Sequence, residues 1–407
     1  MSGQRAAAEP YTTQFTTTVT AVDGRDVRLE TTYFYAESGG QPADTGRIES
    51  AAVEDVQQVD GETVHRLAEE PSFDVGHSVL CTVDWQRRMY TMRAHTASHA
   101  LYGVARGLLD ELSYGGFDIA APDGDPGGDE KVRIDFRTST DIDDGTLLEL
   151  ERGVNEVVWN AHDVSWEQVP TQDAFDREDV AYNAATEEGL VGESETVRLV
   201  TIEDVDVAAC GGTHVRNTRE IGPVTVLDHS NPGEGLTRVE FAVGPAGIDR
   251  RVAEKRAALA GSAALETNVA DLPDGIVRLR EERDELRDEV DDLTTALLDA
   301  RIDQLAATPL RRGEQTWVVG TVEHAGPNAV ADHLRGRERE ESADVIALAG
   351  AGESPFLVVR AGEQVDAESV VDDVTSEFGG GGGGSPTVAQ GGGIGVPGER
   401  VVEYLRE

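Results

Sequence analysis

Two short stretches decide the fold of this 407-residue chain: His95-Thr96-Ala97-Ser98-His99 and Cys210-Gly211-Gly212-Thr213-His214. Each stretch places two good metal ligands four residues apart. One segment offers two imidazoles and the other a thiolate with an imidazole, which together complete the ligand set of one Zn²⁺ ion. If one ion joins them, the chain between residues 90 and 245 must fold around a metal.

Neither stretch is decisive alone. His95 and His99 lie in residues 85–109, where apolar positions recur at helical spacing, so both imidazoles share one helix face. Such a pair also fits two solvent-facing histidines, and the second stretch also fits a glycine turn with an incidental thiol. Four soft or borderline donors in two pairs favour zinc. Four protein ligands would indicate a structural ion, and three with a water a hydrolytic one, so both remain open.

Composition restricts the class of protein. The formal charge is −43, and only Lys131 and Lys255 of the 35 basic residues are lysine. This pattern predicts adaptation to very high salt, where repulsion between carboxylates is screened within about 3 Å at 1 M. An acidic disordered chain is disfavoured, because 39% of the residues are apolar and periodic patterns recur.

Cysteine usage and hydropathy indicate the compartment. We find no apolar run of about 20 residues and no signal peptide. Cys81 lies in the strand-like residues 78–83 and is expected to be buried, so no disulfide framework exists and a cytoplasmic location is expected. The remaining histidines lack such pairing and are interpreted as structural or exposed.

The patterns predict an α+β chain of four parts. Residues 1–88 form a small β-barrel, with strands at 14–22, 26–32, 33–35 and 78–83 and a turn at Asp23-Gly24. Residues 89–245 form a zinc-containing α+β domain. Its expected elements are a helix at 147–160, strands at 132–136, 197–202 and 224–227, and a Gly- and Asp-rich loop at 121–130.

The third part, residues 246–310, is helical. Ile276, Leu279, Leu286, Val290, Leu293, Leu297 and Ala300 form a heptad seam that Arg283 interrupts. This seam pairs either with the preceding helix or with a second chain. Residues 311–407 alternate strand and helix and form an α/β domain. Its glycine tract at 379–384, which lacks the Lys of a P-loop, fits a linker or a surface that another chain or an RNA backbone approaches closely.

One loop of the barrel carries further candidates. Residues 38–46 offer bare backbone at Gly39 and Gly40, an amide at Gln41 and a carboxylate at Asp44. The loop could bind a small polar group or an RNA terminus, although its composition also fits an ordinary hairpin turn.

These motifs together resemble the editing region of alanyl-tRNA synthetases, and still more the long form of the free-standing alanyl-tRNA editing proteins called AlaX. The resemblance rests on Tyr33-Phe34-Tyr35, Gly39-Gly40-Gln41-Pro42, Asp44 and Gly46, then on residues 92–99, and then on Cys210 to Val215 with Asn217-Thr218 and Ile221-Gly222. The glycine tract with Ala389-Gln390-Gly391-Gly392-Gly393 looks like the C-terminal domain of the same synthetases, and the resemblance covers residues 11–400.

The resemblance implies hydrolysis in trans of tRNA(Ala) mischarged with serine or glycine. The family's zinc ligands correspond to His95, His99, Cys210 and His214. Gln41, His95 and Cys210 are the implied catalytic residues. The implied substrate-binding residues are Gly39, Gly40, Gln41, Asp44, Thr213 and Arg238. Only ten residues precede the first strand, so synthesis of Ala-tRNA is not expected.

Two departures from the family pattern stand out. Ser98 is polar where the family has an apolar residue, and the acidic loop 121–130 lies near the region that discriminates the serine hydroxyl. A non-catalytic tRNA-binding protein with a structural zinc is the alternative. A phosphoesterase is disfavoured, because Ala331-Asp332-His333-Leu334 lacks the Asp-His-His signature. The partner is tRNA, and a homodimer through residues 276–300 or the C-terminal domain is a further expectation.

Overall fold

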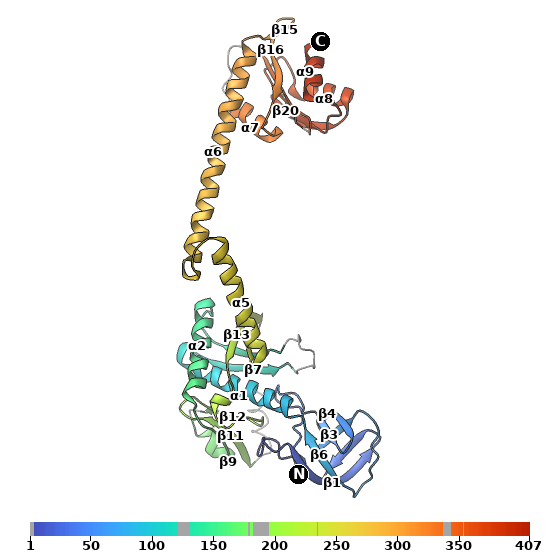
Figure 1. Ribbon diagram of the computed structural model, residues 1–407, viewed down its shortest axis with the longest axis vertical. Helices are drawn as coiled ribbons and strands as arrows, with labels where there is room; N and C mark the ends of the chain where they lie inside the picture. The colour runs from blue at the N-terminus through green and yellow to red at the C-terminus, as the bar shows by residue number, and fades with distance from the viewer. Residues whose placement is uncertain are drawn as a thin grey trace. The chain divides into compact units, whose positions relative to one another are not determined.

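The computed structural model describes residues 4–120, 130–177, 180–181, 195–233, 235–336, 343–352 and 354–407. The chain divides into two compact units, Met1–Ala260 and Gly261–Glu407, and each is described by itself (Figure 1). Both units combine helices with β-sheets, so the predicted α+β class is confirmed. Within the described ranges, no helix has the length and apolar character needed to cross a membrane.

The first unit begins with a closed barrel in the strand order β1-β2-β5-β4-β3-β6. Its strands are β1 (Gln14–Asp23), β2 (Asp26–Leu29), β3 (Gly46–Ile48), β4 (Ala51–Val59), β5 (Glu62–Leu67) and β6 (Ser78–Val83). The predicted Asp23-Gly24 turn joins β1 to β2, with Gly24 at a φ of 59°. Cys81 is buried in the barrel core, as expected.

The strand predicted at residues 33–35 is wrong. This segment is irregular, although Phe34 and Tyr35 are buried. The backbone N–H of Tyr35 donates to the carboxylate of Asp44, which also pairs with the fully buried guanidinium of Arg88. The segment is therefore held by a buried ion pair to the helix that follows the barrel, and not by a sheet.

Two helices and two sheets complete the first unit. Helix α1 (Trp85–Leu108) begins at Asp84, whose carboxylate accepts the backbone N–H groups of Gln86 and Arg87. Helix α2 (Asp144–Asn160) packs beside α1, and both share one apolar core with the sheet β13-β14-β8-β7. The strands of this sheet are β7 (Ser113–Ile119), β8 (Val132–Arg137), β13 (Val224–Gly233) and β14 (Leu236–Val243).

The second sheet of this unit has the order β10-β12-β11-β9. Its strands are β9 (Val164–Pro170), β10 (Val180–Ala181), β11 (Thr196–Ile202) and β12 (Asp206–Ala209). The short helices are α3 (Thr171–Phe175) and η1 (Thr218–Glu220), and α5 (Pro245–Ala264) reaches the boundary between the units. Of the predicted loop at 121–130, residues 121–129 lie outside the described residues.

The second unit carries a long helix and a six-stranded sheet in the order β15-β16-β17-β18-β20-β19. The strands are β15 (Leu310–Arg312), β16 (Gln315–Val322), β17 (Val345–Gly350), β18 (Phe356–Ala361), β19 (Gly381–Gly384) and β20 (Val388–Gly392). The helices are η2 (Val269–Asp271), α6 (Leu272–Ala306), α7 (Pro327–Gly336), α8 (Ala367–Phe378) and α9 (Gly398–Arg406). The glycine tract supplies the edge strand β19, and it is not a linker.

Candidate metal centre

The two sequence stretches meet in the first unit. His95 and His99 lie on α1, and Cys210 and His214 lie on the turn after β12. One donor atom from each of these four residues lies within 4.8 Å of the others. The Cys210 Sγ is 3.3 Å from the Nε2 atoms of both His95 and His214. The chain therefore brings together a His₃Cys set that fits one metal ion.

Each imidazole is held by a hydrogen bond at its Nδ1 atom. The Nδ1 of His95 lies 2.9 Å from Gln41 Oε1, the Nδ1 of His99 lies 3.0 Å from Asp206 Oδ2, and that of His214 lies 3.2 Å from Thr96 Oγ1. The Thr96 hydroxyl donates to the Met92 carbonyl, so toward His214 it acts as an acceptor. All three imidazoles therefore carry the proton on Nδ1 and present Nε2 to the centre.

Gln41 links the barrel to this centre. Its Oε1 accepts hydrogen bonds from His95 Nδ1 and from the backbone N–H of Thr213, and its Nε2 donates to Thr213 Oγ1. The side chain is fully buried, and all three of these bonds cross from the barrel loop to residues at the centre. One amide thus fixes a ligand on α1 and the turn that carries Cys210 and His214.

Asp206 holds the second imidazole. Its carboxylate accepts a hydrogen bond from His99 and pairs with the guanidinium of Arg106, which lies about two helical turns after His99 on α1. Asp206 is 4% exposed, so the charge would be costly without these two partners. The pair therefore orients His99 and neutralises the buried carboxylate.

Electrostatics in the cluster suit a cation. Burial raises the pKa of the Cys210 thiol, but the imidazoles of His95 and His214 outweigh it and hold that pKa well below its ordinary value. Burial lowers the pKa of His214 well below its ordinary value. Burial also opposes the charged form of His99, yet hydrogen bonds to Asp206 and Cys210 raise its pKa to about 10. The thiolate of Cys210 and the neutral imidazole of His214 are in the protonation states that metal binding requires, whereas His99, which this pKa makes charged near neutral pH, would release a proton on binding a metal.

The glycines of the turn have different surroundings. A Cβ on Gly212 would lie 2.1 Å from His95 Cε1 and 2.9 Å from Gln41 Oε1, whereas a Cβ on Gly211 would meet nothing within 4 Å. Gly212 is therefore required because His95 and Gln41 pack directly on its Cα. This reason differs from the tight turn expected from the sequence.

The other predicted site residues differ in burial and in their contacts. Thr213 is buried and bonded to Gln41, and Asp44 is buried and paired with Arg88. Gly39 is exposed at the loop tip. Gly40 has a φ of 82° and packs on the backbone of Phe117, while its carbonyl accepts the N–H of Ile119.

Arg238 lies on β14 and forms two hydrogen bonds to the carboxylate of Asp135 on β8. It therefore belongs to the β13-β14-β8-β7 sheet, and its hydrogen bonds and ion pair go to Asp135 and not to the four donors.

Sequence reasoning missed four residues of the site: Thr96, Arg106, Phe117 and Asp206. The Phe117 ring stacks on His95 with centroids 4.7 Å apart. Thr96 lies inside the first motif. The apolar residues four positions before and after it, Met92 and Ala100, indicate that its side chain faces the core. Asp206 carries no such signal, because it is one of 78 acidic residues.

Two family models match segments of the first unit on either side of His95 and His99. The family model described as threonyl and alanyl tRNA synthetase second additional domain matches residues 197–240, which contain Cys210 and His214. The model described as tRNA synthetases class II (A) matches residues 4–87, which contain the barrel and Gln41. Over most of its own length the chain is similar to alanyl-tRNA synthetases.

Individual relatives agree with this family. The alanine–tRNA ligase of Pyrococcus abyssi is 31% identical over 390 residues, which cover 94% of this chain and 41% of the relative. That of Halobacterium salinarum is 33% identical over 383 residues, covering 90% of this chain and 38% of the relative. The chain thus spans about two fifths of the length of these relatives. The crystal structure of the C-Ala domain from Aquifex aeolicus alanyl-tRNA synthetase matches 24% of this chain at 26% identity, with a TM-score of 0.22.

Proposed function

We propose that this protein hydrolyses in trans the aminoacyl ester of tRNA(Ala) that carries serine or glycine, and that it does so in the cytoplasm. The observation that supports this most is the convergence of His95, His99, Cys210 and His214 against the barrel residue Gln41. One matched family model includes Gln41 and the other includes Cys210 and His214, while His95 and His99 lie between the two matched segments.

The four donors would hold Zn²⁺. Bound zinc polarises oxygen atoms of a substrate or water, and four protein donors already complete a tetrahedral set. The chain's own residues prepare the site. Gln41, Asp206 and Thr96 fix the ring orientations, so binding requires little reorganisation.

Substrate contacts are the second part of the proposal. Gly39 and Gly40 at the tip of the barrel loop offer backbone close to the centre, with Gly40 packed on the strand that carries Phe117. The buried residues Gln41, Asp44 and Thr213 support this loop and the turn, and we propose that they contribute to substrate binding by holding both in place. Arg238 is proposed to act through Asp135 on the same sheet as Phe117.

The energetics of amino-acid selection explain why a hydrolytic editing site is needed in addition to the site that selects alanine. An alanine pocket discriminates poorly against serine or glycine, since a methylene or hydroxyl changes binding by only about 1–3 kcal/mol. An editing pocket can discriminate better. It can hydrogen-bond the serine hydroxyl, whereas alanine would leave the same polar groups of the pocket without a partner.

The alternative is a tRNA-binding protein in which zinc is only structural, which the four-donor set itself favours. To separate the two, purified chain is incubated with Ser-tRNA(Ala), Gly-tRNA(Ala) and Ala-tRNA(Ala). Editing predicts release of serine and glycine with Ala-tRNA(Ala) spared. Binding of tRNA with no deacylation above the spontaneous rate would establish the alternative.

Cys210→Ala with metal analysis links activity to the centre. We expect both zinc content and Ser-tRNA(Ala) hydrolysis to fall, because the thiolate is a donor that no neighbour replaces. Cys81→Ala is the matched control, since Cys81 lies in the barrel core. Unchanged zinc and unchanged hydrolysis in Cys210→Ala would exclude the assigned role.

A further inference from the structure

Arg198 on β11 holds the turn that carries Cys210 and His214. One of its guanidinium nitrogens, Nη1, donates to the carbonyl of Cys210 at 2.7 Å and to that of Gly212 at 3.0 Å. The main chain is bound as well, because the N–H of Cys210 donates to the Arg198 carbonyl at 3.0 Å. Arg198 therefore contacts a metal donor residue through both its backbone and its side chain.

The turn has no regular secondary structure, so side chains must fix the direction of its peptide groups. The peptide that joins Gly212 to Thr213 is held at both ends. Its carbonyl accepts from Arg198, and its N–H donates to Gln41 Oε1 at 3.0 Å. Because the carbonyl and the N–H of a trans peptide point in opposite directions, the two side chains bind it from opposite sides. Rotation of this peptide would displace the metal donors before and after it in the chain.

Arg198 is itself held in place by the N-terminal segment, residues 5–11, and by Trp166 on β9. Its Nη2 donates to the Ala7 carbonyl at 2.9 Å, and its Cζ lies 5.3 Å from the centre of the Trp166 ring. The Nε1–H of Trp166 donates to the Ala8 carbonyl at 3.1 Å. The N-terminal segment thus contacts both side chains and fixes the direction of the guanidinium.

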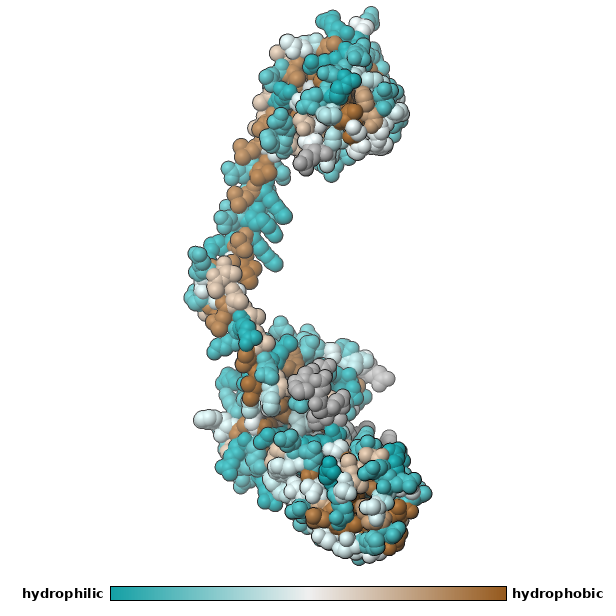
Figure 2. Space-filling model, turned by 45° about the vertical axis from the view of Figure 1, so that its right-hand side comes forward, coloured by the Kyte–Doolittle hydropathy of each residue, from teal (hydrophilic) through white to brown (hydrophobic). Residues whose placement is uncertain are grey.

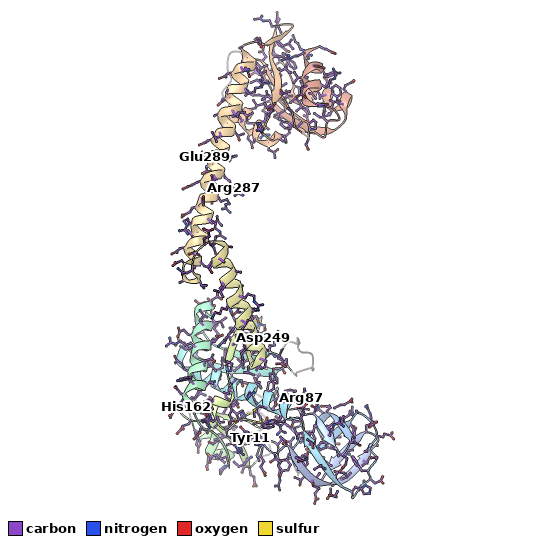
Figure 3. All side chains as sticks on the ribbon, in the orientation of Figure 1. Tyr11, Arg87, His162, Asp249, Arg287 and Glu289 are labelled. Carbon is purple, nitrogen blue, oxygen red and sulfur yellow. The ribbon has the colours of Figure 1, made fainter. Side chains whose placement is uncertain are left out.

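The N-terminal segment has anchors of its own beyond Ala8. The Pro10 carbonyl accepts from Nη1 of Arg88 on α1 at 2.8 Å, and the Tyr11 hydroxyl donates to the carboxylate of Glu220 at 2.6 Å. Tyr11 lies where the barrel meets the rest of the first unit (Figure 3). Arg198 therefore connects the Cys210 turn to a segment that is fixed independently of the turn.

The surroundings of Arg198 differ from those of most charged residues. Hydrophilic residues cover much of the first unit in the view of Figure 2. The Arg198 guanidinium instead bonds to three carbonyls, and its Nε is buried without a partner among the described residues. Burial lowers the pKa of Arg198, and the charge of the Cys210 thiolate acts in the opposite direction. Removing this charge from water is costly, and the carbonyls and the thiolate offset that cost.

We propose that Arg198 is a positioning residue of the metal centre. It holds the Cys210 turn so that the thiolate and the His214 imidazole face the same ion, and Gln41 holds the far end of the same peptide. Arginine suits this role because its planar guanidinium can bind several carbonyls at once and stack on Trp166. The inference rests on the proposed metal site, and it does not depend on which aminoacyl ester is cleaved.

The test uses the full chain loaded with Co²⁺, whose sulfur-to-cobalt charge-transfer band reports ligation by a thiolate. Because the chain has two cysteines, Cys81→Ala first shows that the band arises from Cys210. Arg198→Met is expected to lower the cobalt affinity about 10- to 100-fold and to weaken the band at saturating metal, since the residues that orient metal ligands typically have effects of this size. Arg251→Met is the matched control and should bind cobalt as the wild type does. Arg251 also has a buried Nε without a partner among the described residues, but it donates to the Val224 carbonyl and not to the turn.

Arg198→Lys separates positioning from charge. Lysine keeps the charge, but a single ammonium lacks the planar fork that binds the carbonyls together and stacks on Trp166. We expect its cobalt affinity to lie between those of the wild type and Arg198→Met, and it gives the same test if Arg198→Met does not fold.

Thermal unfolding of the metal-free variants is the second measurement. A purely structural role predicts that the Arg198 variants lose stability but, once folded, bind cobalt with the wild-type affinity and band, and this result would overturn the proposal. A wild-type chain without a thiolate band would refute the metal site itself. A wild-type band that both Arg198 variants retain at full affinity would refute only the role of Arg198.

Discussion

Gly212 and Gly211 are adjacent in the sequence, yet a side chain would collide with His95 and Gln41 at only one of them. A methyl group on Gly212 would overlap His95 and Gln41, whereas one on Gly211 would enter open space. We expect Gly212→Ala to lower zinc affinity about 5- to 150-fold, because accommodating such overpacking costs about 1–3 kcal/mol. Gly211→Ala should bind zinc as the wild type does. Chelator competition measures both, and equal affinities of the two variants would refute the packing argument.

Asp206 offers a second prediction at this scale. Asp206→Asn keeps an oxygen beside His99 Nδ1 but removes the charge that pairs with Arg106. Loss of such a partner typically costs about 10–100-fold in metal affinity, and we expect a loss in this range. Asp204→Asn, at an exposed turn position with a φ of 59°, is the control and should show no change. The same chelator titration measures both variants.

His65 determines a pH dependence in the barrel. Its Nδ1–H donates to the Val27 carbonyl and its Nε2 accepts from Thr32, while burial lowers its pKa to about 4 from the ordinary 6.5. The unfolded chain therefore binds more protons between pH 6.5 and 4, and the free energy of unfolding falls as the pH drops through this window. The loss attributable to His65 is about 3 kcal/mol, complete by about pH 4 and absent above pH 6.5.

The measurement compares wild type with His65→Asn by chemical denaturation at several pH values. The variant is less stable near neutrality, because the ring is lost from the core, but its decline between pH 6.5 and 4 is expected to be shallower. Parallel pH profiles for the two proteins would show that folding does not lower the pKa of His65.

At the scale of elements, the glycines of β19 explain how α8 approaches the sheet. A Cβ on Gly382 would lie 2.6 Å from Val371 of α8 and 2.5 Å from the Gln390 carbonyl, whereas one on Gly383 reaches only Glu368 at 4.0 Å. We expect Gly382→Ala to destabilise the C-terminal unit by about 1–3 kcal/mol. Gly383→Ala should be neutral or slightly stabilising. Thermal unfolding measures the stability of both variants. If Gly382→Ala is as stable as the wild type, close packing against α8 is not the reason for the glycine tract.

The same scale shows where local patterns predict elements and where they do not. Helices α1 and α2 lie where helical periodicity predicts them, because each buries one face in a common core. Residues 33–35 have strand-like composition, yet Asp44 and Arg88 bond to their backbone and no strand forms. Strand β19 was not predicted, since glycine disfavours strands unless a neighbouring helix needs the space.

At the scale of the whole molecule, the excess of 43 negative charges is the dominant feature. Repulsion among them destabilises the compact state unless salt screens it, and the Debye length shrinks from about 10 Å at 0.1 M to about 3 Å at 1 M. We expect the melting temperature to rise steeply with KCl over this range. Sucrose, which does not screen charge, should not replace the salt at low ionic strength. A melting temperature independent of KCl would contradict adaptation to high salt.

The sequence by itself determined which four side chains could bind a metal ion, the barrel and the main helices, because ligand chemistry and hydrophobic periodicity are local properties of the chain. Only the tertiary structure decided which groups orient those donors. Gln41, Thr96 and Asp206 come from a barrel loop, a helix face and a strand, and no spacing relates them. Their roles arise from chain segments that meet only after folding, where burial makes each ring nitrogen require a partner.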